Sequence, residues 1–171
     1  MPYRRPWSIG ANGTWTKEAA MRDPDVVLEE LLDRQVKAEE AIHNGDAEPR
    51  LAMWSTRDPV TLFGAALSKR GAEEVRAFFP VLASSFSDCT AYRFELVNAE
   101  IGEDLAYTVG YEHTSVSIDG VPVSYVLRVT HVYRREDGEW KIVHRHGDNP
   151  PVEQRPLADA VGGEAADAQI G

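Results

Sequence analysis

Two arginines, a histidine and a tyrosine in the second half of the sequence are spaced so that they could act on an acidic small molecule. Arg128 and Arg145 could hold a carboxylate or an enolate between planar guanidinium groups and stabilise developing negative charge. His113 and Tyr111 are the candidate catalytic residues, because imidazole and phenol groups can donate or accept a proton. The further substrate-binding residues expected beside the arginines are Tyr107 and Thr130.

The same two arginines also have a purely structural interpretation. Two guanidinium groups in an enclosed space need negative charge nearby, because an unpaired buried charge is costly. Glu39 or Glu40 from a helix near the start of the chain, or Glu95 from a strand, could provide it. The sequence leaves both interpretations open.

The elements that must position these residues are four strands with hydrophobic residues at alternate positions, expected at about 91–101, 105–118, 122–136 and 139–147. Asp119-Gly120 and Asp137-Gly138 are typical of two-residue type I′ hairpin turns. Centring each hairpin on its turn places Tyr111 opposite Arg128, and Thr130 opposite Arg145, on one face of the sheet. A β-bulge in the strand over 122–136 would exchange some residues between the faces.

The opposite face of this predicted sheet is also apolar. Since neither side can be left in water, we expect helices to cover one side and a second copy of the chain to cover the other. Hence a homodimer is predicted. The expected interface residues, all on the face opposite Arg145, are Trp140, Ile142, His144 and His131.

Three helices precede the sheet in this interpretation. Apolar residues recur at three- and four-residue spacing from Asp25 until Asn44-Gly45. A short helix carries Leu51, a strand covers about 60–64, and a third helix follows Gly71. We therefore predict an α+β domain over 25–148, with an N-terminal arm at 1–24 and a flexible acidic tail at 149–171.

The composition restricts the partners. Eighteen Lys and Arg against 28 Asp and Glu give a formal net charge of −10, which disfavours nucleic acid and anionic membranes. No apolar run reaches the length of a membrane span, and the N-terminus lacks the apolar stretch of a signal peptide. The single cysteine, Cys89, cannot form an internal disulfide. We expect a cytoplasmic protein.

The order of elements, with the ending Trp140-Lys141-Ile142-Val143-His144-Arg145-His146, resembles the nuclear transport factor 2-like superfamily over about residues 25–148. That ending, and Asp104-Leu105-Ala106-Tyr107, are similar to SnoaL-like polyketide cyclase relatives and to the association domain of calcium/calmodulin-dependent kinases. The resemblance implies three N-terminal helices packed on a curved, mainly antiparallel sheet that forms a cone-shaped pocket. The convex side would serve for dimerisation.

The resemblance also assigns the two faces. It places Thr130 and Arg145 on the pocket side, so the face with His131 and His144 becomes the convex dimer surface. His131, His144 and His146, with Glu112 nearby, could suggest a metal site. On the convex side, however, we expect these histidines to make hydrogen bonds in the interface, and we predict no metal and no organic cofactor.

Ketosteroid isomerases of this superfamily use a tyrosine and two aspartates. At those positions the resemblance places Ala38, Leu62 or Phe63, and Thr130, which cannot do that chemistry. Two hypotheses therefore remain. The first is a cofactor-free cyclase, isomerase or dehydratase that acts by acid–base chemistry on a small acidic or keto compound. The second is a non-catalytic ligand-binding or oligomerisation domain.

Overall fold

The computed structural model describes residues 7–9, 15–17 and 22–151. Its elements, in chain order, are β1 (Trp7–Ile9), β2 (Trp15–Lys17), α1 (Pro24–Ile42), α2 (Glu48–Met53), β3 (Thr61–Phe63), β4 (Ser68–Arg70), α3 (Ala72–Ser84), β5 (Phe86–Ile101), β6 (Leu105–Ile118), β7 (Val121–Glu136) and β8 (Glu139–Asp148). β1 and β2 pair with each other, and the other six strands form one sheet in the order β4-β3-β8-β7-β6-β5. The predicted α+β class is confirmed: helices pack on a curved sheet that is antiparallel except for the β3–β8 pair.

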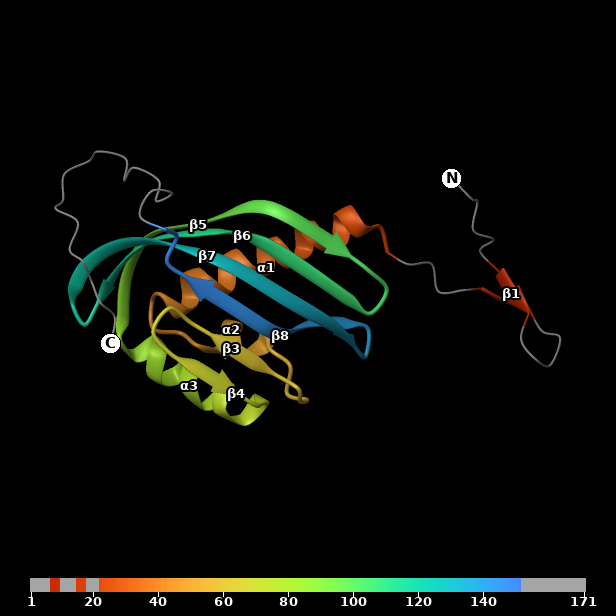
Figure 1. Cartoon of the computed structure of the whole chain (residues 1–171), viewed down its shortest axis with the longest axis horizontal. Helices are drawn as coiled ribbons and strands as arrows, with labels where there is room; N and C mark the ends of the chain where they lie inside the picture. Colours follow the sequence, from red (N-terminus) through yellow and green to blue (C-terminus); the bar gives the residue numbers. More distant parts are fainter. Residues whose placement is uncertain (1–6, 10–14, 18–21, 152–171) are drawn as a thin grey trace.

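Helix α1 lies along the concave side of this sheet (Figure 1). The Asp23 carboxylate accepts a hydrogen bond from the Asp25 amide, and Pro24 occupies the first turn, where a missing N–H costs nothing. The buried stripe of α1 consists of Val27, Leu31, Gln35, Ala38, Glu39 and Ile42. Two of these six residues are charged or amide side chains, so α1 brings polar groups into the interior together with the apolar ones.

Both predicted Asp-Gly turns form, and all four of their residues have positive φ, between 50° and 87°. The β6–β7 register is the predicted one, with Tyr111 opposite Arg128 and Val109 opposite Thr130. A local turn signal was therefore sufficient to align these two strands.

The β7–β8 register departs from the prediction after its first rungs. Tyr133 pairs with Ile142 as expected, but Val132 pairs with His144, so β8 carries one extra residue, Val143. Because side chains alternate between faces, this bulge moves every later β8 residue to the other face. Arg145 consequently lies opposite His131, and the prediction that it shares a face with Arg128 and Thr130 is wrong.

The assignment of the faces is also corrected. The β6 and β7 residues buried on the helix-covered face include Ala106, Thr108, Glu112, Thr114, Val129, His131 and Tyr133, each under a tenth exposed. By alternation, the residues expected to line the pocket lie on the other, outer face: Tyr107, Tyr111, His113, Arg128 and Thr130. Alternation separates two faces, but it does not say which of them the helices cover.

The four predicted interface residues do not form one surface. Ile142 and His131 are fully buried within a single chain, and Ile142 forms a β-bridge to Trp54 in the core. Trp140 packs partly buried against the same core, whereas the bulge places His144 on the outer face. This set is therefore wrong as an interface, while the homodimer itself stays a prediction.

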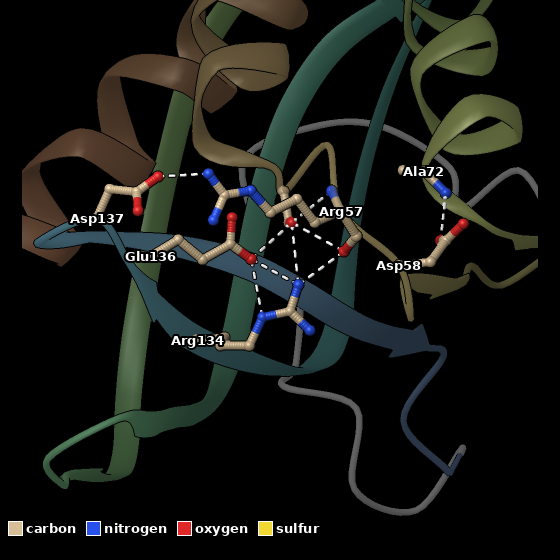
Figure 2. A network of polar contacts seen from close by, with 7 residues as sticks. Arg57, Asp58, Ala72, Arg134, Glu136 and Asp137 are labelled. Atoms are coloured by element: carbon tan, nitrogen blue, oxygen red, sulfur yellow. Dashed lines mark hydrogen bonds and ion pairs between the residues drawn. The ribbon is translucent and has the colours of Figure 1, made fainter.

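A polar network ties the segment after α2 to the β7–β8 hairpin (Figure 2). The Ser55 hydroxyl donates to Glu136 at 2.8 Å, and Arg134 donates to the Arg57 carbonyl at 2.7 Å and to Glu136 at 2.8 Å. Arg57 also forms an ion pair with Asp137. These contacts hold the C-terminal end of α2 against the sheet. They thereby also position Arg50, the buried arginine of α2.

Most of the predicted N-terminal arm and acidic tail lies outside the described residues. Helix α3 continues through Pro80 to Ser84. The sequence pattern did not predict the short strand β4 or the strands β1 and β2. Within the described part of the chain, no helix has the length and apolar character needed to cross a membrane.

Candidate functional site

The covered side of the sheet contains a group of charged and polar side chains that we call the interior cluster. Its members come from two helices and three strands: Gln35, Glu39, Arg50, Glu112, His131 and Arg145. Such groups are rarely buried unless they are paired. The interior of this domain is therefore built around polar contacts as well as apolar packing.

Two ion pairs balance the charge of the interior cluster. Arg145 Nη2 lies 2.6 Å from Glu112 Oε2, with side chains 11% and 4% exposed. Arg50 and Glu39 form the second pair, with side chains 3% and 7% exposed. The structural interpretation of Arg145 thus holds with a different partner, since Glu112 neutralises it and Glu39 neutralises Arg50.

His131 lies between these pairs and is fully buried. Burial holds its pKa well below the usual value, and the positive charges of Arg50 and Arg145 lower it further. The imidazole is therefore neutral near pH 7. Arg50 Nη2 lies 3.4 Å from Nε2, and since a guanidinium can only donate, Nε2 accepts and the ring proton lies on Nδ1.

Gln35 connects the interior cluster to two buried tyrosines. Its amide nitrogen lies 3.5 Å from Glu112 Oε1 and 3.3 Å from the Tyr92 hydroxyl, and its oxygen accepts from Tyr133 at 3.3 Å. Burial raises the pKa of Tyr133 to about 12, and burial with the nearby Glu112 charge raises the pKa of Tyr92 well above its usual value. Both phenols therefore stay protonated near neutral pH.

Apart from Arg50 Nη1, which is in the ion pair with Glu39, two N–H groups of the interior cluster have no hydrogen-bond partner among the described residues. They are His131 Nδ1 and Arg145 Nε, on residues that are direct neighbours across the β7–β8 ladder. An unpaired buried donor is costly, because it has lost its hydrogen bonds to water. Both groups can only donate here, so the chemistry they suit is that of a carbonyl or carboxylate oxygen.

Apart from Arg145, the predicted catalytic and binding residues lie on the outer face, and the charged or titratable Arg128 and His113 have carboxylate partners there. Arg128 makes two hydrogen bonds to Asp148, at 3.0 and 2.6 Å. His113 Nε2 lies 3.0 Å from Glu95, which also pairs with Arg93. The structure thus keeps Tyr111 beside Arg128, and it separates both from Arg145 by the thickness of the sheet.

Sequence reasoning missed Gln35 and Arg50, and it placed Glu112 and His131 on the wrong side. Gln35 could have been found, because it occupies a core position in the apolar repeat of α1. No comparable apolar repeat marks Arg50, because its helix α2 has only six residues. Among the described residues, no three His, Cys, Asp or Glu side chains are placed to hold a metal ion. The bulge accounts for this, since it puts His131 and His144 on opposite faces.

A groove outside the interior cluster runs between α1 and β5. It has a volume of about 480 Å³ and is lined by Leu28, Leu32, Val36 and Phe94, with Asp25, Glu29 and Asp33 along it. We call it the α1 groove. The Phe94 ring also contacts the His131 ring edge-on, at 6.4 Å between centroids. One aromatic side chain therefore touches both the groove and the interior cluster.

Comparisons with known proteins agree with this architecture. A family model described as "SnoaL-like domain" matches residues 32–152. A proposed dehydratase of the NTF2-like family from Streptomyces avermitilis is 20% identical, with a TM-score of 0.62, over 75% of this chain and 99% of that one. A proposed ketosteroid isomerase from Parabacteroides distasonis is 18% identical, with a TM-score of 0.56, over 73% and 89%.

The association domain of C. elegans CaMKII has the same fold as well. It is 18% identical, with a TM-score of 0.55, over 74% of this chain and 98% of that one. No curated protein matches the sequence. At these identities the solved structures establish the fold, and their names include two proposed enzymes and an association domain on one scaffold.

Proposed function

The chain belongs to the SnoaL-like domain family, and on that premise we propose that it binds a small carbonyl-bearing or acidic molecule at the interior cluster and acts on it by acid–base chemistry. The reaction class is that of a cyclase, isomerase or dehydratase. The observation that carries this proposal is the pair of unpartnered donors on His131 and Arg145. An oxygen of the ligand would accept from both.

The roles of the residues follow from their charge states. His131 is neutral near pH 7, and its Nδ1–H can donate to a carbonyl oxygen of the ligand, which polarises the carbonyl and stabilises an enolate oxygen. Arg145 and Arg50 place positive charge where an enolate oxygen would develop negative charge. Phe94, which contacts the His131 ring, offers an apolar wall for the body of the ligand. The proposal therefore uses the interior cluster in place of His113 and Tyr111.

Proton transfer next to a carbonyl can be tested without knowing the substrate. We expect the protein to accelerate deuterium incorporation from D₂O at the α-carbon of members of a panel of enolisable ketones and keto acids, followed by proton NMR. His131→Gln should reduce this exchange by about 10²-fold or more, because glutamine has no donor at the position of Nδ1 and the loss of one donor to a developing oxyanion costs on that order. The matched control is His113→Gln on the outer face, which should exchange like the wild type.

Two outcomes would contradict this assignment. Exchange that is lost in His113→Gln and kept in His131→Gln would move the chemistry to the outer face. A protein that binds panel members without catalysing exchange would be a ligand-binding domain. Thermal melts of both variants distinguish loss of chemistry from loss of folding.

The second candidate function is assembly, and the outer face favours it. Tyr107, Val109, Tyr111, Val126 and Val132 lie half-buried on this face of β6 and β7 within one chain, so it presents aromatic and β-branched side chains. A second copy of the chain would bury them. We propose a homodimer through this face, in place of the surface around Ile142.

Sedimentation at micromolar concentration tests this assembly. We expect a dimer for the wild type and a monomer for Val132→Glu, because a charge at the centre of the face would be buried without a partner. Glu73→Lys, at an exposed position of α3 on the other side of the molecule, should leave the dimer intact. A wild type that sediments as a monomer would contradict the assembly function.

A further inference from the structure

A row with two glycines crosses the helix-covered face of the sheet beside the interior cluster. In the paired registers Gly110 lies opposite Val129, and Val129 lies opposite Gly147. A Cβ atom on Gly110 would come within 2.7 Å of Phe94 Cζ, so the Phe94 ring leans over Gly110. A Cβ atom on Gly147 would come within 2.9 Å of Arg145 Cζ, so the guanidinium leans over Gly147. The two glycines therefore make the space in which these long side chains lie.

Phe94 separates the α1 groove from the buried donors. It pairs with Glu112 across the β5–β6 ladder, so its side chain belongs to the helix-covered face. Its ring lines the groove and contacts the His131 ring edge-on. Leu96, the next β5 residue on this face, is 38% exposed. The helix-covered face is therefore open to solvent beside Phe94, and the Phe94 ring lies between this opening and His131.

The charge balance of the interior cluster restricts what could bind there. Arg50 and Arg145 are already balanced by Glu39 and Glu112, so a ligand carboxylate would enter as an unpaired buried charge. An uncharged carbonyl oxygen has no such cost, and it can accept from the unpartnered His131 Nδ1 and Arg145 Nε. The interior cluster therefore favours a ketone over a carboxylic acid.

The α1 groove suits an apolar chain that has no negative charge at its far end. Leu28, Leu32 and Val36 form a stripe at four-residue spacing, which extends over about 12 Å of helix. The three carboxylates along the groove would repel a second anionic group. The groove volume of about 480 Å³ is in the range of small-molecule sites.

We infer that the α1 groove is the entrance to the interior cluster and that Phe94 is a gate that determines specificity. This inference rests on the proposed function, because it uses the same two donors. The ligand class is an uncharged ketone with an apolar chain. Its oxygen accepts from His131 and Arg145, its chain lies in the α1 groove, and the Phe94 ring turns out of the space over Gly110 to admit it.

A series of methyl ketones, from acetone to methyl octyl ketone, tests the entrance in the full chain. We expect each added methylene to strengthen binding by about two- to fourfold, because it leaves water for the groove. The methyl signals of Leu28, Leu32 and Val36 should shift on titration, and that of Val81, exposed on α3, should not. The carbonyl ¹³C signal of the bound ketone should move downfield, since two donors polarise the carbonyl.

Variants of Phe94 test the gate. Phe94→Ala should speed the association of methyl octyl ketone by about tenfold, because binding no longer waits for the ring to move. Phe94→Trp should slow it, because the indole is larger than the ring it replaces. Phe94 is only partly buried, so both variants are expected to fold. The matched control is Phe78→Ala, a partly buried aromatic residue of α3, which should bind like the wild type.

The groove carboxylates can be tested with a charged analogue. Methyl octyl ketone that carries a carboxylate at the far end of its chain should bind several-fold more weakly than the parent ketone. Glu29→Gln with Asp33→Asn, both exposed on α1, should remove most of this difference. Glu73→Gln with Glu74→Gln, exposed on α3, should leave it unchanged.

Two results would overturn the inference. Affinity that does not rise with chain length would show that the chain does not lie in the groove, and equal association rates for the wild type and both Phe94 variants would show that the ring is not on the path. Deuterium exchange separates this inference from the proposed function. Exchange that depends on neither chain length nor Phe94 would leave only the proposed function standing, whereas binding with both dependences and no exchange would leave only the entrance.

Discussion

Replacing Arg145 by methionine is expected to lower the free energy of unfolding by about 3–5 kcal/mol. The reason is that the substitution leaves the Glu112 carboxylate, which is 4% exposed, without its ionic partner at 2.6 Å. Loss of the charge is the main effect, because methionine retains much of the apolar length of the side chain. Urea denaturation followed by circular dichroism measures the difference.

Arg128→Met is the matched control, since it removes the same group from the other face of the sheet. The Arg128–Asp148 pair has side chains 42% and 41% exposed, so its loss should cost at most about 1 kcal/mol. Glu112→Leu combined with Arg145→Met should recover most of the stability lost in Arg145→Met, because no charge then remains unpaired. Equal destabilisation by the two single variants would contradict the placement of Arg145 in the interior.

The stability of the protein should fall as the pH is lowered from 6.5 toward 5, and His131 should be the main cause. Burial, with the charges of Arg50 and Arg145, lowers the pKa of folded His131 well below its ordinary value of 6.5. Below pH 6.5, His131 therefore binds a proton in the unfolded chain and does not bind one in the folded chain. The contribution of neutral His131 to the free energy of unfolding is complete above pH 6.5. As the pH falls below 6.5, this contribution decreases by about 1.4 kcal/mol per pH unit until the pKa of folded His131 is reached.

His131→Gln should flatten this dependence, whatever it does to the stability at pH 8. Burial and the nearby His146 also lower the pKa of His144, so His144→Gln should remove a further, smaller part. The shifted carboxyls Glu95, Glu136 and Glu139 have pKa values below 4.5, so their contribution to stability is lost only in more acidic solution. Denaturation curves at several pH values provide the measurement. Parallel pH profiles for the wild type and His131→Gln would refute the prediction.

Features that depend on residues close together in the chain could be predicted without the structure. Asp119-Gly120 and Asp137-Gly138 adopt the positive φ values that their turns require, and the first of them aligned β6 with β7 over the whole hairpin. The apolar repeat of α1 and the change of period before β5 predicted three helices followed by a sheet, as observed. These signals are local, since each depends on the conformational preferences of residues close together in the chain.

The candidate site depended on two facts that no local pattern contains. The first is the extra residue at Val143, which turns Arg145 toward His131 and Glu112 and away from Arg128. The second is which face of the sheet α1 covers. Both faces carry large apolar side chains, so the alternation of residues along the strands cannot distinguish them. Packing decided both: α1 brings Gln35 and Glu39 to the face that carries Glu112, and these groups need partners once water is excluded. Burial of charge is a property of the assembled interior, so only the tertiary structure could show which residues are paired there.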